Sequence, residues 1–394
     1  MKVTVVSIGS FDTQYSDYHI MRDIILGMLK RGFQVTLIQK QYFDVPRYPA
    51  PFTKYLGTQL IVKNIRFDRK AKADLRARYL ADLFYYHKAC KLMKKDLPDK
   101  IFLQSNNTAF ITVWYAKHIL KRPIHYNEQD IFPENALFAG ILNSNSLIYK
   151  VAHALQKYAY KNANALSTIS DDMKKTIVNR FGIDKDKIKV IYNWGHEELR
   201  ANPLSENVFL KRFPKKDEEI RVVYAGNLGK MQNVELILQT AARMKEYEDI
   251  SFYIVGSGVN EENLKKYARE HELGNMKFVG MQPPEDVADL YQAADINVIP
   301  LQGGLIYAAL PSKTADCLIA HKPIITCVDE ESGFADIVKK FGFINTSPEN
   351  PDALKNAIIQ VAEKKRKLGD FSLLHALFDR DKNVTKYCDI IEKM

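Results

Sequence analysis

Pro311, Ser312 and Lys313, followed by Asp316, have the residue types of a site for a phosphorylated ligand. Pro311 suits the first turn of a helix, and the free backbone N–H groups of the next two residues point out of the helix start. That end attracts anions, and the lysine adds a positive charge without a metal. Asp316 could accept hydrogen bonds from the vicinal hydroxyls of a ribose. The stretch indicates a nucleoside diphosphate site, although an ordinary capped helix before a buried strand explains it equally well.

A second candidate phosphate loop is Gly226-Asn227-Leu228-Gly229-Lys230. Its two glycines follow an apparent strand, so that the backbone could approach a phosphate closely, and Lys230 would neutralise it. Gly256-Ser257-Gly258 repeats the glycine-rich strand exit. Alone, such a loop is a turn more often than a binding site. In combination with Lys313 it favours a diphosphate site.

Alternating strand and helix patterns organise the elements that would position these loops. Short β-rich runs such as 2–8, 33–38 and 100–104 alternate with helical periodicity, which predicts parallel sheets with ligands at the strand carboxyl ends. A chain of 394 residues is long for one core. We therefore predict an α/β fold with these segments: an amino-terminal domain over 1–195, a linker over 196–219, a carboxy-terminal domain over 220–370, and a final helical segment over 371–394 that could cross to the amino-terminal domain.

Charge is unevenly distributed along the chain. Residues 1–200 hold 32 Lys and Arg against 18 Asp and Glu, a net charge of +14, and the remainder carries −4. Residues 66–95 read as a basic amphipathic helix, which is either a solvated face packed on the sheet or a contact for anionic lipid or a phosphorylated acceptor. Nucleic acid is not expected, because the basic stretch lacks an interleaved aromatic platform.

Several classes are excluded by what the sequence lacks. There is no apolar run of 18 residues and no signal-peptide pattern, so we expect a cytoplasmic protein, with the inner face of the cell membrane as a candidate peripheral location. The four cysteines show no CxxC spacing, and the histidines show no metal spacing such as HExxH. We predict no required metal and no other cofactor.

The order of motifs resembles the retaining nucleotide-sugar glycosyltransferases of family 4, which have the GT-B fold of two Rossmann-like domains facing across a cleft. The resemblance spans nearly the whole chain. Its motifs are VVYAGNLGK (222–230), FYIVGSG (252–258), KFVGMQPPEDVADLYQAADINVIP (277–300) and LPSKTADCLIAHKPII (310–325). GNLGKMQ with QDIFPEN is similar to the bacterial branch that builds O-antigen and capsule repeat units.

The resemblance implies that the carboxy-terminal domain binds a UDP- or GDP-sugar as co-substrate and that the amino-terminal domain takes a glycan or lipid-linked saccharide acceptor. Lys230 and Lys313 would stabilise the departing diphosphate, and Asp316 would hold the ribose. The donor-binding residues expected are Gly226, Asn227, Gly229, Gly256, Val279, Gly280, Pro311, Ser312 and Asp316.

The chain departs from the family pattern at three places. Two glutamates usually lie eight residues apart around the Pro-Ser-Lys helix, where this chain has Ala308 and Asp316. Asn227 replaces the arginine common in the first phosphate loop. Gly9-Ser10-Phe11 replaces paired glycines after the first strand and is the candidate acceptor contact. These changes affect positions that would recognise the donor sugar and the acceptor.

Asp130 is the candidate base for the acceptor hydroxyl, because it follows a strand whose end would face the cleft. Glu134, four residues on, is its candidate orienter. The alternative is that Asp130 caps a turn and Glu134 is solvated. Two other functions remain open: an isomerase such as a UDP-N-acetylhexosamine 2-epimerase, and a non-catalytic protein that binds an anionic membrane surface.

Overall fold

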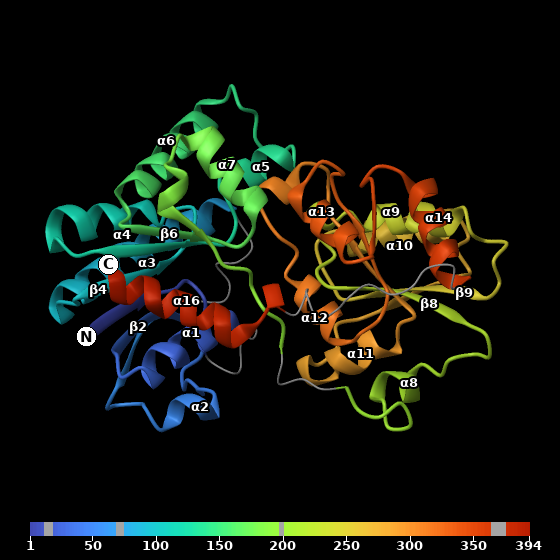
Figure 1. Cartoon of the computed structure of the whole chain (residues 1–394), viewed down its shortest axis with the longest axis horizontal. Helices are drawn as coiled ribbons and strands as arrows, with labels where there is room; N and C mark the ends of the chain where they lie inside the picture. Colours follow the sequence, from blue (N-terminus) through green and yellow to red (C-terminus); the bar gives the residue numbers. More distant parts are fainter. Residues whose placement is uncertain (12–18, 68–74, 197–200, 364–375) are drawn as a thin grey trace. The chain divides into compact units, whose positions relative to one another are not determined.

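The structure is a computed structural model of the 394-residue chain, and it describes residues 1–11, 19–67, 75–196, 201–363 and 376–394 (Figure 1). The chain divides into two compact units. Unit 1 comprises Met1–Tyr192 and Arg380–Met394, and unit 2 comprises Asn193–Asp379. Each unit has its own parallel sheet, as the alternating patterns predict.

Unit 1 contains a seven-stranded sheet in the order β3-β2-β1-β4-β5-β6-β7, with every paired strand parallel. Its strands are β1 (Lys2–Val6), β2 (Gln34–Gln41), β3 (Leu60–Arg66), β4 (Lys100–Gln104), β5 (Ile124–Glu128), β6 (Ala165–Thr168) and β7 (Ile188–Val190). Its helices are α1 (His19–Lys30), α2 (Ala50–Thr53), α3 (Leu75–Asp96), α4 (Phe110–Tyr115) continuing as the π-helical η2 (Ala116–Leu120), α5 (Glu134–Phe138), α6 (Leu147–Asn162), α7 (Asp171–Phe181), the short 3-10 turn η3 (Lys185–Lys187) and α16 (Arg380–Lys393).

Unit 2 contains a six-stranded parallel sheet in the order β10-β9-β8-β11-β12-β13. Its strands are β8 (Ile220–Ala225), β9 (Ile250–Val255), β10 (Met276–Val279), β11 (Ile296–Pro300), β12 (Ile324–Cys327) and β13 (Ile344–Thr346). Its helices are α8 (Val208–Arg212), α9 (Val234–Ala242), α10 (Glu261–Glu270), α11 (Val287–Ala293), α12 (Lys313–Ile319), α13 (Gly333–Lys340) and α14 (Pro351–Ala362), with the 3-10 turns η4 (Lys230–Gln232), η5 (Pro284–Asp286) and η6 (Leu305–Tyr307).

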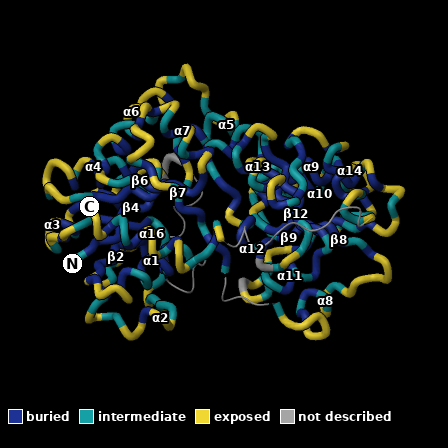
Figure 2. The backbone as a smooth tube through the Cα atoms, viewed as in Figure 1, coloured by how far each residue is buried: buried dark blue, intermediate teal, exposed yellow. Residues whose placement is uncertain are grey.

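The central strands of both sheets are buried on both faces, and Figure 2 shows them in the buried colour. Strands covered on both sides by helices read as continuous apolar runs, and β8 (IRVVYA) and β9 (ISFYIV) have that character. Helix α7 has ordinary caps at both of its ends. Ser170 accepts a hydrogen bond from the Met173 N–H at the start of α7, and Gly182 ends that helix in the left-handed conformation.

The residues predicted as a linker, 196–219, belong to unit 2. They include α8, which contacts α11, and the buried Asp289 carboxylate accepts hydrogen bonds from the backbone N–H groups of Asn202 and Val208 at 2.6 and 2.7 Å. Desolvation opposes ionisation of Asp289, but hydrogen bonds from Asn202 and Val208 outweigh it and lower its pKa. The buried Asp289 carboxylate of α11 therefore holds this stretch in place, although its mixed charges are typical of a linker.

The final helix α16 packs against α1 in unit 1. Its Tyr387 hydroxyl donates to Asn127 Oδ1 at 3.1 Å, and Asn383 Nδ2 donates to the Tyr192 carbonyl at 2.9 Å. Gly27 of α1 lies directly beneath this helix, because a Cβ atom at residue 27 would come within 2.3 Å of Val384 Cγ1. The first part of the predicted segment, residues 371–375, lies outside the described residues.

Candidate functional site

Two glycine-rich loops meet at the carboxyl ends of β8 and β9 in unit 2. Gly226 and Gly256 adopt φ angles of +145° and +133°, which residues with a Cβ atom rarely adopt. A Cβ atom on Gly256 would lie 1.9 Å from the carbonyl oxygen of Gly226. The Leu228 N–H also donates to the Ser257 carbonyl at 2.9 Å. The structure thus brings both predicted phosphate loops together.

Lys313 reaches the same strand end from the first residue of α12. Its Nζ atom lies 3.8 Å from the ring centroid of Tyr224 and would be 2.9 Å from a Cβ atom on Gly226. The residue as a whole is half-buried, but Nζ itself is buried and has no hydrogen-bond partner within the described part of the chain. Burial without an anionic partner lowers the pKa of Lys313 to about 7. The ammonium group therefore lacks the counter-charge that a buried cation requires.

The other residues predicted to bind the diphosphate lie in the first glycine loop and at the start of α12. Gly229 precedes η4, whose first residue, Lys230, is exposed. Pro311 is buried, whereas Ser312 is exposed and its side chain makes no capping hydrogen bond to α12. The Asn227 carbonyl accepts a hydrogen bond from the Tyr224 hydroxyl at 2.7 Å, and this bond ties the ring beneath Lys313 to the first loop.

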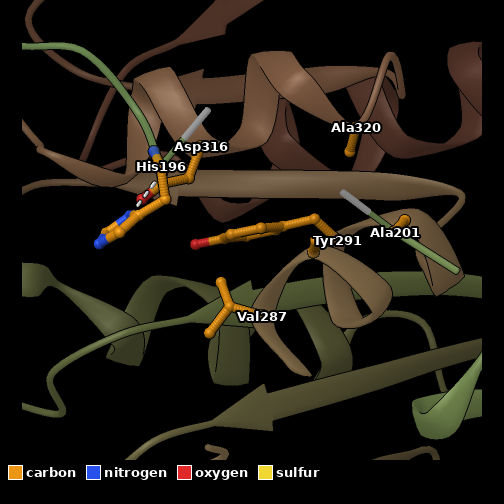
Figure 3. A pocket seen from close by; sticks show the side chains of 7 residues that line it. His196, Ala201, Val287, Tyr291, Asp316 and Ala320 are labelled. Carbon is orange, nitrogen blue, oxygen red and sulfur yellow. Dashed lines mark hydrogen bonds and ion pairs between the residues drawn. The ribbon is translucent and has the colours of Figure 1, made fainter. Parts of the chain in front are cut away.

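Asp316 lies one turn into α12 and is held by a residue that the sequence analysis did not select. The backbone N–H of His196 donates to Asp316 Oδ1 at 2.9 Å, and Nδ1 of the same histidine lies 3.0 Å from that oxygen. Figure 3 shows this pair at one side of a small cavity of about 30 Å³, with the Tyr291 ring beside it. No local motif marks His196, because it follows the strand-to-helix pattern of unit 1 and precedes that of unit 2.

Two further predicted features flank the loops. Val279 ends β10 and accepts a backbone hydrogen bond from Gly256 at 3.0 Å, so the Val279-Gly280 segment adjoins the second glycine loop. Ala308 is fully buried at the end of η6. A methyl group therefore occupies the position where the family pattern has its first glutamate.

The two candidate carboxylates of unit 1 have different environments. Asp130 follows β5 and is exposed. Glu134 is fully buried in α5, where its Oε1 atom accepts a hydrogen bond from the Tyr149 hydroxyl at 2.7 Å and lies 3.2 Å from His153 Nδ1. The solvated alternative for Glu134 is therefore wrong. Besides these residues of α6, Arg180 of α7 lies near it, with Nη1 3.7 Å from Oε1, and none of these contacts joins Glu134 to Asp130.

Glu128 is a buried acid that the sequence analysis did not single out. It ends β5, where its Oε2 atom accepts hydrogen bonds from Gln156 Nε2 at 2.8 Å and from the Tyr160 hydroxyl. Desolvation raises its pKa to about 8, although the hydrogen bond from Tyr160 acts in the opposite direction. Glu128, two positions before Asp130, is thus held in the core by buried hydrogen bonds.

The candidate acceptor contact after β1 is mostly buried. Ser10 and Phe11 are covered, and Phe11 packs edge-on against Phe52 with ring centroids 6.0 Å apart. The Phe11 N–H donates to Gln39 Oε1 at 2.8 Å. Packing therefore accounts for Phe11, and Gly9 is the half-buried residue of the three.

The described ranges contain neither clustered metal ligands nor a membrane-spanning helix. Among those residues, no group of three or more His, Cys, Asp or Glu side chains is placed to share a metal ion. None of the described helices combines the length and apolar character needed to cross a bilayer.

The chain matches known families in both of its units. Residues 20–194 match the model described as Glycosyltransferase Family 4, and residues 206–372 match the model described as Glycosyl transferases group 1. WbjE of Pseudomonas aeruginosa, a probable glycosyltransferase, is 26% identical over 305 residues, which cover 76% of this chain and 75% of that protein. WcaI of Escherichia coli K12, a putative colanic acid biosynthesis glycosyl transferase, is 24% identical over 218 residues, which cover 54% and 53% of the two chains.

Solved structures share the fold at low sequence identity. HepE of Anabaena, crystallised in complex with UDP and glucose, superimposes with a TM-score of 0.71 at 16% identity, over 100% of both chains. The predicted α/β class with two Rossmann-like domains of the GT-B type is confirmed by this likeness and by the two parallel sheets.

Proposed function

Because this chain is a glycosyltransferase, with the Family 4 and group 1 models matched by its two halves, we propose that it moves a sugar from a nucleoside diphosphate sugar to a saccharide acceptor with retention of anomeric configuration. The acceptor is a glycan or a polyprenyl-diphosphate-linked saccharide of a cell-envelope polysaccharide. The relatives named for colanic acid biosynthesis and for probable glycosyl transfer support this assignment. The two matches favour transfer over the isomerase alternative.

The observation that supports donor binding most directly is the environment of Lys313. A buried ammonium group without a hydrogen-bond partner in the described chain faces Gly226, whose missing side chain leaves room for a ligand atom. A diphosphate would supply the missing negative charge. Its neutral donors would be N–H groups of the two glycine loops other than those of Gly226, Leu228 and Gly256, which donate within the chain. We propose that Lys230, Ser312 and Gly229 complete this diphosphate site.

Transfer requires the sugar–phosphate bond to break while the nucleoside diphosphate leaves with additional negative charge. Lys313 and Lys230 would stabilise that charge, because a fixed cation attracts a nearby negative charge more strongly in a low-dielectric site than in water. The acceptor hydroxyl loses its proton in the same reaction. Asp130 is the proposed base, and an oxygen of the departing phosphate is the alternative proton acceptor.

We propose that Asp316 binds the ribose of the donor with His196 as its positioning partner. The two contacts from His196 occupy Oδ1, which leaves Oδ2 as the oxygen for ribose hydroxyls. An aspartate is one methylene shorter than the glutamate of the family pattern, and the contacts from His196 hold it in a single orientation. Gly280 is proposed to lie near the base.

The test is nucleotide binding and sugar transfer with a panel of UDP-, GDP- and dTDP-sugars. Lys313→Ala should weaken UDP binding by about 10- to 150-fold, because a hydrogen bond to a charged group contributes about 1.5–3 kcal/mol. Lys277→Ala is the matched control, since that lysine also lies over a tyrosine ring, at 4.9 Å from the Tyr253 centroid, but outside the glycine loops. Binding that is equally strong in the wild type and Lys313→Ala would reject the proposed diphosphate site. Absence of turnover across the panel would reject the transfer reaction.

A further inference from the structure

One outer surface of unit 1 combines exposed apolar side chains with an excess of lysine. The α4–α6 face, as we call it, consists of the exposed side chains of α4, η2, α6 and residues 121–122. Its apolar members are Trp114, Ile119, Leu147, Ile148 and Val151. At the start of α6, Leu147 is 76% exposed and Ile148 is 68% exposed. Apolar side chains gathered in this way on a surface mark a contact site more often than isolated ones do.

The helices of this face are held side by side. Helix α4 contacts α6 and α3. His118 Nε2 lies 2.9 Å from the Tyr158 hydroxyl, and Lys117 Nζ is hydrogen bonded to Asn162 Oδ1. The rings of Trp114 and His118 lie at 39° to each other, with centroids 5.6 Å apart. The tryptophan of α4 and the outer residues of α6 are therefore parts of one surface.

Acidic residues are missing from the segments that form this face. The sequence has no Asp or Glu between Asp99 and Glu128, and none between Glu134 and Asp171. Lys117, Lys121, Lys150 and Lys161 are all exposed there. The only charges on α4, η2 and α6 are therefore positive.

The neighbouring helix α3 also exposes apolar and lysine side chains. Its two acids turn toward the sheet, where Asp82 pairs with Lys40 and Asp96 pairs with Lys63. Phe84 and Lys88 of this helix are exposed. The predicted basic amphipathic helix is thus one part of a wider surface; its residues 68–74 lie outside the described chain.

The other side of the unit 1 sheet lacks this bias. Figure 1 shows α1 and α16 on that side. Acids and bases alternate there, and Arg31 pairs with Asp389 at 2.6 Å and with Glu392 at 3.1 Å. A positive surface with exposed tryptophan, isoleucine and leucine is therefore confined to one side of unit 1 within the described residues.

We propose that the α4–α6 face docks unit 1 on an anionic membrane surface. Side chains such as Leu147 and Ile148 would enter the region between headgroups and acyl chains, where tryptophan is also favoured, and the lysines would pair with anionic headgroups. The charge composition favours lipid over a protein partner, because the centres of protein interfaces are depleted of lysine. The proposal does not depend on the identity of the donor or acceptor.

The test is sedimentation of the full chain with vesicles of phosphatidylcholine alone and of phosphatidylcholine with 30% phosphatidylglycerol. The protein should sediment with the anionic vesicles only, and more weakly at about 0.5 M salt, where the Debye length is shorter. Leu147→Ser/Ile148→Ser and Lys150→Glu/Lys161→Glu should each lose at least tenfold in partition coefficient. UDP binding and the melting temperature of both variants should match the wild type, because the changed side chains are exposed.

Matched controls lie in other parts of the molecule. Val259→Ser/Met281→Ser removes two apolar side chains of unit 2 that are 93% and 74% exposed. Lys30→Glu/Lys266→Glu reverses two exposed lysines away from the face. Both controls should sediment like the wild type. The proposal is overturned if wild type ignores anionic vesicles, or if face and control variants lose binding equally. It is also overturned if light scattering shows a wild-type dimer that the Leu147→Ser/Ile148→Ser variant dissociates, since a second copy would then cover the face.

Discussion

A buried lysine with a pKa lowered to about 7 changes its protonation state when an anion binds beside it. At pH 8 the Lys313 side chain of the free protein is mostly neutral. A diphosphate next to Nζ favours the charged form and raises the pKa again. Binding of UDP at pH 8 should therefore take up close to one proton, measured by calorimetry in buffers of different ionisation enthalpy. Lys313→Met should abolish this uptake, and an uptake that persists in the variant would assign the proton to another group.

Glu128 makes the stability of unit 1 depend on pH. Its pKa is raised from 4.5 to about 8 by burial, so the folded protein holds a proton that the unfolded chain has lost between these two values. Stability should therefore fall as pH rises through this window, by up to about 1.4 kcal/mol per pH unit for one proton. Glu128→Gln keeps the acceptor for Tyr160 and Gln156 without the titration. Urea unfolding at pH 5 and pH 8 should show a smaller loss for this variant, and an identical loss in both proteins would contradict the assignment.

At the scale of elements, the contact between the first two loops of unit 2 depends on glycine. Gly256→Ala would place a methyl group 1.9 Å from the Gly226 carbonyl oxygen at a φ of +133°. The strained backbone alone costs about 1–3 kcal/mol, and the displaced loop should also weaken UDP binding. Gly274→Ala is the matched control, because a Cβ atom there meets nothing within 4 Å. Chemical denaturation and UDP titration of both variants test this, and equal behaviour would show that the loops can separate freely.

Sequence patterns predicted the central strands and missed two of the four edge strands, β3 and β13. Runs such as Val222-Val223-Tyr224 are buried on both faces and therefore apolar throughout, which makes β8 easy to recognise. The edge strand β3 alternates buried and exposed residues, with Lys63 and Asn64 in its middle, and it was not predicted. Within α3, Tyr79 is 42% exposed, whereas Tyr85 and Tyr86 are fully buried.

Site residues that belong to a local sequence motif could be predicted. Contacts between residues far apart in the sequence could not. Gly226, Gly256 and Lys313 stand out because glycine and lysine follow strands or start a helix. His196 lies 120 positions from Asp316, and Asn202 lies 87 positions from Asp289. Such contacts depend on how the chain folds back on itself, which spacing along the sequence does not encode.

At the scale of the whole molecule, the segment 380–394 completes unit 1 although unit 2 precedes it in the chain. Gly27→Ala should destabilise the α1–α16 contact, because the new methyl group would collide with Val384 Cγ1 at 2.3 Å; overpacking of this kind costs about 1–3 kcal/mol. Val384→Ala should restore most of that loss in the double variant. A thermal-denaturation cycle of the four proteins measures the coupling, and strictly additive effects would show that the helices do not meet at these residues.

The placement of α16 also fixes an order of events during protein synthesis. Residues 193–379 leave the ribosome as one uninterrupted stretch, so unit 2 can fold as soon as it has emerged. The amino-terminal half is translated first, yet the side of α1 around Gly27 stays uncovered until residues 380–394 follow. Chaperones that recognise uncovered apolar helices should therefore occupy the nascent amino-terminal half for most of translation and leave it only when α16 arrives.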